Sequence, residues 1–213
     1  MSHDPQSPEI PPSYFSQFNL PPHLHVDLSA LEKSFYAQSR RLHPDRFAAR
    51  PASEQEAALA ASSRLNDAYR TLRDPILRTE YLLALEGIQL EEQSRAATDA
   101  AKAAGTEKKQ VAPPDLLEEA FELNMQLEEM RMAKKMGDDD PQTRADLEAA
   151  REKFTAMLTE SQQQLETLWT SWDNAVDSSD DSAKESAKQA MVALLNRRSY
   201  IRNLVRDVNA ALE

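Results

Sequence analysis

The stretch that decides the fold of the first part of this 213-residue chain is Arg40-Arg41-Leu42-His43-Pro44-Asp45-Arg46-Phe47. Pro44 has no amide proton with which to continue a helix, and its ring disfavours the helical conformation at the residue before it. A helix that reaches Leu42 must therefore stop at His43. The stretch lies between two segments that both have helical patterns, so it is predicted to form the bend between two helices.

The segment before the bend has the pattern of an amphipathic helix. Its apolar residues follow one another at spacings of 3, 4 and 7, which places them on one helical face; they are Leu28, Leu31, Phe35 and Leu42. Asp27 and Ser29 can cap its N-terminus. The pattern predicts a helix from Leu28 to Leu42.

A second helix is predicted after the bend and a short loop. Ser53 and Glu56 have the spacing of a capping box, and the helix should end near Asp74 and Pro75. Its apolar stripe consists of Ala58, Ala61, Leu65, Ala68 and Leu72. Because alanines are small, the two helices can approach closely as an antiparallel hairpin, with Phe35 and Leu42 in the seam.

Short elements are expected on both sides of this hairpin. Residues 14–18 are rich in aromatic side chains and are predicted to form a short helix that caps the hairpin. Residues 76–85 are densely apolar and should form another helix, which Gly87 ends. The Pro-rich residues 1–13 are expected to be a disordered tail.

The second half of the chain predicts a different arrangement. Residues 89–113 contain almost no large apolar side chains, which indicates a linker. Residues 114–213 then carry three apolar stripes, separated by polar turns at residues 137–141 and 173–181. The first stripe consists of Leu116, Ala120, Leu123, Leu127 and Met130. Three stripes joined by two turns predict an antiparallel three-helix bundle.

Composition supports an all-α fold and limits the possible functions. The chain has only 3 glycines and few β-branched runs. Its net charge of -11 is uneven: residues 14–88 hold 9 basic and 9 acidic side chains, whereas residues 89–213 hold 16 and 25. Such a chain is repelled by phosphate backbones and anionic lipid, so neither nucleic acid nor a membrane is an expected partner. No signal peptide or apolar span is apparent, and a cytoplasmic location is expected.

Residues 40–47, in their predicted position between two helices, resemble the J-domain of co-chaperones. This resemblance implies that His43, Pro44 and Asp45 form the trigger that stimulates a DnaK/HscA-type chaperone ATPase. Three arginines beside the trigger can form a basic patch that docks on an acidic groove of that partner: Arg40, Arg41 and Arg46. Without the resemblance, His43 would be a helix-terminal cation and the arginines a solvated helix face.

Two further motifs narrow the resemblance to the HscB-type co-chaperones of iron-sulfur cluster assembly, in their bacterial form without a zinc module. They are Phe47 after the trigger and the run Arg78-Thr79-Glu80-Tyr81-Leu82-Leu83. The order of an N-terminal J-domain at 14–88 and a bundle at 114–213 is also similar. The resemblance implies that the bundle binds an IscU-type scaffold protein.

The scaffold-binding residues implied by this resemblance are Leu117, Phe121, Glu122 and Tyr200. Helical geometry gives an independent reason to expect Leu117, Phe121 and Met125 outside the core, because they lie about 100 to 180° from the centre of the buried stripe. Glu118 and Met125 occupy neighbouring positions but differ in character from the family's usual residues. An alternative is that this face packs against the J-domain or the linker.

No catalytic site is predicted, since no pair of titratable groups is placed for acid-base chemistry. His23, His25 and Asp27 could be imagined as metal ligands, but without a fourth placed ligand an ordinary loop is the better interpretation. The chain has no cysteine, and neither a cofactor nor a metal is expected. The expected protein is a monomeric co-chaperone. The alternatives are a J-protein with a different client and a passive helical adaptor without ATPase-stimulating activity.

Overall fold

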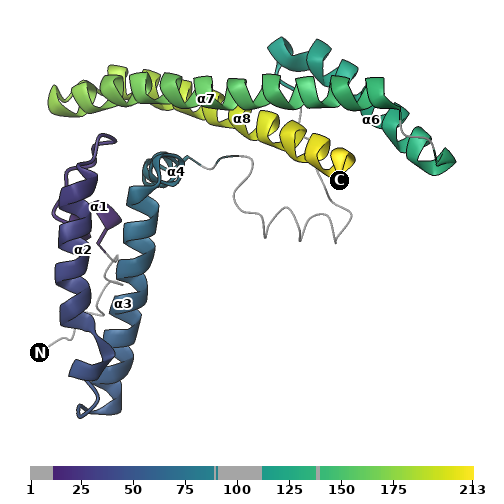
Figure 1. The fold of residues 1–213 in the computed structure, drawn as a ribbon. Helices are drawn as coiled ribbons and strands as arrows, with labels where there is room; N and C mark the ends of the chain where they lie inside the picture. Colours follow the sequence, from purple (N-terminus) through teal and green to yellow (C-terminus); the bar gives the residue numbers. More distant parts are fainter. Residues whose placement is uncertain (1–11, 89, 91–111, 138–139) are drawn as a thin grey trace, which may run out of the picture. The chain divides into compact units, whose positions relative to one another are not determined.

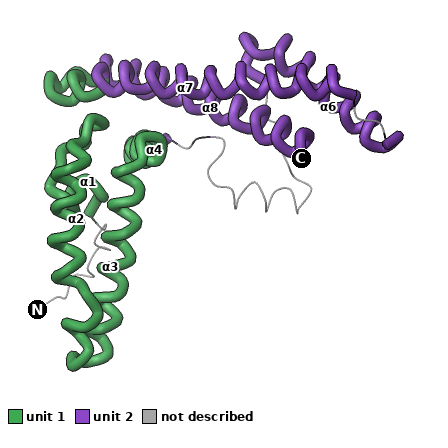
Figure 2. Tube along the Cα trace, in the orientation of Figure 1, with its two compact units in different colours: residues 1–87, 172–181 green, residues 88–171, 182–213 purple. Residues whose placement is uncertain are grey.

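The structure is a computed structural model that describes residues 12–88, 90, 112–137 and 140–213. All regular elements in these ranges are helices, which confirms the all-α prediction (Figure 1). The chain divides into two compact units, Met1–Gly87 with Trp172–Asp181 and Ile88–Ser171 with Ser182–Glu213 (Figure 2). The predicted domain boundaries at residues 88 and 114 stay predictions. The tail at 1–13 and the linker at 89–113 lie almost entirely outside the described residues.

The first unit is built on the hairpin of α2 (Leu28–Leu42) and α3 (Ala52–Arg73). Asp27 caps α2, because its carboxylate accepts hydrogen bonds from the amides of Ser29 and Ala30 at 2.9 and 3.0 Å. The helix ends at Leu42, and His43 has extended backbone angles of φ -57° and ψ 131°. This is the conformation that the residue before a proline is expected to adopt.

Small and branched side chains fill the seam of the hairpin. Leu31 of α2 is buried, as are four members of the predicted α3 stripe: Ala58, Leu65, Ala68 and Leu72. Phe35 stacks on Tyr69 with ring centroids 4.2 Å apart, a contact that the sequence pattern did not indicate. Leu42 is half-buried. The predicted hairpin is present, and an aromatic pair strengthens its centre.

The predicted capping box at the start of α3 is wrong. The helix begins at Ala52 with Pro51 as its N-cap residue, and no side chain makes a capping hydrogen bond. Ser53 lies inside the helix and therefore cannot act as its cap. Instead, Gln55 Nε2 donates to the carbonyl oxygens of Ala48 and Arg50 at 3.4 and 2.8 Å. These contacts tie the loop after the bend to the first turn of α3.

Two short helices complete the N-terminal part of the first unit. In α1 (Tyr14–Gln17) Phe15 is buried, and Phe18, which follows, is buried too. The ring of Tyr81 in α4 (Pro75–Leu85) stacks on Tyr14 at 4.4 Å, and its hydroxyl accepts the Tyr14 amide at 2.8 Å. After α4, Gly87 has a φ of +79°, a left-handed conformation that favours glycine. The predicted helix stop is confirmed.

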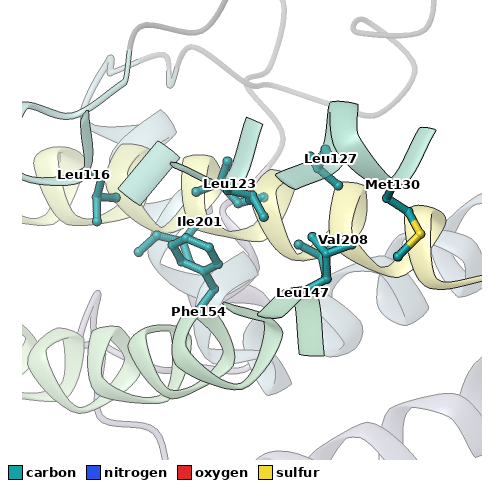
Figure 3. Packing of buried hydrophobic residues seen from close by; sticks show 9 residues of the cluster. Leu116, Leu123, Leu127, Met130, Leu147, Phe154, Ile201 and Val208 are labelled. Atoms are coloured by element: carbon teal, nitrogen blue, oxygen red, sulfur yellow. The ribbon is translucent and has the colours of Figure 1, made fainter. Parts of the chain in front are cut away.

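The second unit contains most of the three long helices α6 (Leu117–Met136), α7 (Pro141–Asp177) and α8 (Asp181–Leu212), and the 3-10 turn η2 (Pro114–Leu116) precedes α6. All five residues of the predicted α6 stripe are buried. Four of them pack with residues of α7 and α8, as Figure 3 shows for Phe154, Leu147, Ile201 and Val208; the four are Leu116, Leu123, Leu127 and Met130. The predicted three-helix packing is therefore observed.

The turn between α6 and α7 is also as predicted where it is described. Gly137 ends α6 with a φ of +71°. Asp140 caps α7, since its carboxylate accepts the Gln142 amide at 3.1 Å and the Thr143 hydroxyl at 2.5 Å. These hydrogen bonds lower the pKa of Asp140. Asp138 and Asp139 lie outside the described residues.

The predicted turn at 173–181 is too long. Helix α7 continues through Asp177, and the break is confined to residues 178–180, where Ser179 has a φ of +56°. No glycine or proline interrupts residues 173–177, so the acidic residues alone do not end the helix. Asp173 is only 9% exposed, which makes it part of the packed interior of the first unit.

Asp173 holds the loop that precedes α2. Its two carboxylate oxygens accept the amides of Leu24 and His25 at 2.7 and 3.0 Å, and one lies 2.8 Å from His25 Nδ1. Trp172 Nε1 donates to the carbonyl of Pro22 at 3.0 Å. Leu24 is fully buried beneath these bonds. These hydrogen bonds satisfy polar groups whose burial without a partner would destabilise the folded state.

We predict that Asp173→Ala destabilises the protein by about 1 to 3 kcal/mol, because it leaves the Leu24 and His25 amides without their acceptor. Thermal or urea denaturation measures the change. The matched control is Asp177→Ala, which removes only the pair of His23 Nε2 with an exposed carboxylate at 3.0 Å. Equal destabilisation by the two variants would contradict this interpretation of Asp173.

Candidate functional site

The bend after α2 presents His43, Pro44 and Asp45 at the surface; we call these three residues the docking loop. The side chain of His43 is 58% exposed and that of Asp45 is 89% exposed. Residues Pro44–Arg46 form a 3-10 turn, in which the Arg46 amide donates to the His43 carbonyl at 3.0 Å. The fold therefore holds the loop outward instead of burying it.

The docking loop is closed by its own atoms. His43 Nδ1 lies 3.3 Å from the Asp45 amide nitrogen and 3.4 Å from its carboxylate oxygen Oδ2. Phe47 donates its amide to the Pro44 carbonyl at 2.9 Å, and its side chain is half-buried. A helix end on one side and a half-buried aromatic on the other thus fix the loop, while its ionisable groups stay accessible.

The three arginines predicted as a basic patch are all exposed. Arg40 and Arg41 occupy the last turn of α2, and Arg46 ends the 3-10 turn. Cations in the last turn of a helix are also favoured by the helix dipole. The structure therefore brings these three arginines to the same bend as the docking loop.

The row of apolar residues predicted to lie outside the bundle core is exposed on α6. Leu117, Phe121 and Met125 are 56, 67 and 52% exposed, although four other residues of the same helix are buried. Glu118 and Glu122 are exposed beside them. Among the described residues, nothing covers this row, so the alternative of a face packed against other parts of the chain is not seen there.

Tyr200, the fourth residue that the resemblance implies as scaffold-binding, is not exposed like the other three. It is half-buried and packs against the bundle core. Burial raises the pKa of Tyr200, so the hydroxyl is neutral at physiological pH. The apolar side of α8 is broad, since Leu195 and Leu204 are also buried.

The imagined metal site in the N-terminal loop is not formed. Asp27 caps α2, while His23 and His25 pair with Asp177 and Asp173. Within the ranges that the structure describes, no group of three or more His, Cys, Asp or Glu side chains is placed to hold a metal ion. In the same ranges, no helix has an apolar stretch long enough to cross a bilayer. Asp173 is the structural residue that the sequence pattern missed, since its partners are about 150 positions away.

No family model matches the chain. It is similar to two curated proteins named co-chaperone protein HscB homolog: 42% identical over 88 residues to that of Bordetella petrii and 44% over 84 residues to that of Bordetella avium. These matches cover 41 and 39% of this chain. The chain spans about half the length of these relatives, 52 and 50% respectively.

Solved structures match over nearly the whole chain. The chaperone HscB from Vibrio cholerae aligns with a TM-score of 0.57 and 27% identity, over 93% of this chain and 96% of the other. The human co-chaperone protein HscB aligns with a TM-score of 0.58 over 96% and 84%, and at 22% identity it supports the fold alone. These matches confirm the predicted J-domain and C-terminal bundle. The chain is therefore similar to HscB co-chaperones in sequence over its matched part and in fold over nearly its whole length.

Proposed function

We propose that this protein stimulates the ATPase of a DnaK/HscA-type chaperone through the docking loop and delivers an IscU-type scaffold protein through its C-terminal bundle. The observation that carries the proposal is the exposed, internally closed His43-Pro44-Asp45 loop at the end of a rigid hairpin. The similarity to proteins named HscB supports it. The proposal involves no cofactor and no chemistry on the chain itself.

The loop would act by binding one state of the chaperone better than the other. A protein can shift a partner's conformational equilibrium only by its difference in affinity for the two states. Because the loop is held in one shape by helix α2, the 3-10 turn and Phe47, little ordering entropy is lost when it docks. The exposed arginines add a long-range attraction that orients the encounter with an acidic groove.

The bundle contributes a separate surface for the scaffold protein. Leu117 and Phe121 are large apolar side chains that a folded protein exposes at a cost, and exposed apolar residues in a row are typical of interaction sites. Acidic side chains at the edge, Glu118 and Glu122, favour a basic partner. Tyr200 is half-buried, so its proposed part in binding is limited to the accessible portion of its ring.

We predict that Asp45→Asn and His43→Gln each abolish stimulation of the chaperone's single-turnover ATPase. Both side chains are exposed, so the substitutions should leave the fold intact and remove only contacts with the partner. The matched control is Asp67→Asn on α3, which loses a surface pair with Arg70 and should stimulate normally. Stimulation that survives both loop substitutions would instead indicate a passive adaptor.

The basic patch should control affinity rather than maximal stimulation. We predict that combined replacement of Arg40, Arg41 and Arg46 by alanine raises the half-saturating concentration about tenfold or more at low salt, by removing electrostatic steering. Titration of the ATPase at two ionic strengths measures this. The difference from the unaltered protein should shrink at high salt, where surface charges are screened. A salt-independent defect would show that the arginines act in another way.

We predict that Leu117→Ser or Phe121→Ser weakens scaffold binding about tenfold or more, because each removes apolar area from the proposed contact. Calorimetry with an IscU-type scaffold protein measures the affinity. Leu59→Ser is the matched control, since Leu59 is 66% exposed on α3 in the other unit. If ATPase stimulation is normal but no scaffold binding is detected even with the unaltered protein, the client is a different one.

A further inference from the structure

The exposed apolar residues of α6 extend beyond the proposed scaffold contact. Met132 and Met136 are 62 and 77% exposed, and they follow Met125 at spacings of 7 and 4. At about 100° per residue, these spacings keep all of them on one face of the helix. We call this face the apolar strip; it consists of Leu117, Phe121, Met125, Met132 and Met136.

The apolar strip lies on the side of α6 opposite the bundle core. Its centre is about 150° around the helix from the centre of the buried stripe. From the first to the last residue it is about 28 Å long at 1.5 Å per residue. Single exposed apolar residues are ordinary, but five in one row along a whole helix are not.

The two edges of the strip differ in charge. On one edge lie three exposed glutamates, which we call the acidic edge: Glu118, Glu122 and Glu129. The other edge is mixed: Arg131 Nη1 pairs with Glu128 Oε1 at 2.5 Å, and the exposed Lys135 follows towards the end of the helix. The helix dipole accounts for Glu118 in the first turn and Lys135 in the last. It accounts neither for Glu129 in the second half of the helix nor for the five apolar side chains.

We infer that the scaffold protein of the proposed function docks along the full length of α6, not only at its first half. The partner surface that fits is an elongated apolar ridge, such as one face of a helix. Basic side chains would border it where it meets the acidic edge. This inference rests on the proposed function. Because only one edge is uniformly acidic, a ridge with basic side chains along one of its sides would lie along the strip in a single direction.

The test replaces both distal methionines, Met132→Gln with Met136→Gln, and measures affinity for a cluster-free IscU-type scaffold protein. Glutamine keeps the length and helix propensity of methionine but is polar, and both positions are exposed, so the fold should be retained. Affinity is expected to fall about tenfold. Leu59→Gln on α3 is the matched control and should not change it.

A charge reversal tests the direction of docking. Glu129→Lys places a cation in the acidic edge and is expected to weaken binding several-fold, with the loss shrinking at high salt. The same reversal at exposed Glu148 of α7 changes the net charge equally but lies on another helix. If both reversals have the same effect, only net charge matters and the assigned direction is wrong.

Methionine oxidation tests the same contact in the unaltered protein, so that its result does not depend on whether a variant folds. Hydrogen peroxide transfers one oxygen atom to a methionine thioether, giving the sulfoxide and water, at a rate that depends on exposure. Bound scaffold protein should slow this reaction at Met132 and Met136 several-fold, while fully buried Met191 reports the background.

The outcomes separate this inference from the proposed function. If Phe121→Ser weakens binding but the distal methionines tolerate glutamine and stay reactive in the complex, the contact ends near Met125 and the inference is overturned. If neither Phe121→Ser nor the methionine pair affects scaffold binding, the proposed function of this face fails as well.

Discussion

The docking loop depends on one constraint: Pro44 cannot continue the α-helix that precedes it. It ends α2 at Leu42 and leaves His43 in an extended conformation, from which the 3-10 turn starts. Because the hairpin seam fixes both helices, the direction of the bend is fixed as well. The packing between α2 and α3 thereby holds the side chains of His43, Pro44 and Asp45 at the surface, although these three residues take no part in that packing. The ionisable groups of the loop thus stay free for a partner, while buried leucines and alanines stabilise the support.

The two units use different physical means to present their surfaces. In the first, compact packing of small side chains exposes a charged loop on a segment with equal numbers of acidic and basic residues. In the second, a helix has two apolar faces, of which the bundle core uses only one. If the protein contacts two partners as proposed, surfaces of different chemistry make each surface unsuitable for the other's partner.

Local sequence patterns predicted those features whose causes are local. The α6 core stripe, the stop at His43 and the left-handed Gly87 all follow from spacing or from the backbone of one residue. The capping-box prediction was wrong because the helix begins at Ala52, so that Ser53 lies inside it. Asp173 was misread as part of a turn, since its role depends on amides almost 150 positions earlier. Tyr200 proved half-buried because the width of an apolar face depends on how closely its neighbours pack.

An exposed apolar strip carries a risk of self-association, and the acidic edge reduces it. Dimers of identical chains are usually two-fold symmetric. If two copies of α6 paired face to face in antiparallel fashion, the symmetry would bring each acidic edge against the other, so that glutamates would oppose glutamates. The same charges attract a partner whose ridge is bordered by basic groups. One row of carboxylates would therefore both favour the proposed contact and disfavour this pairing of copies, which is how a helix can keep large apolar side chains accessible.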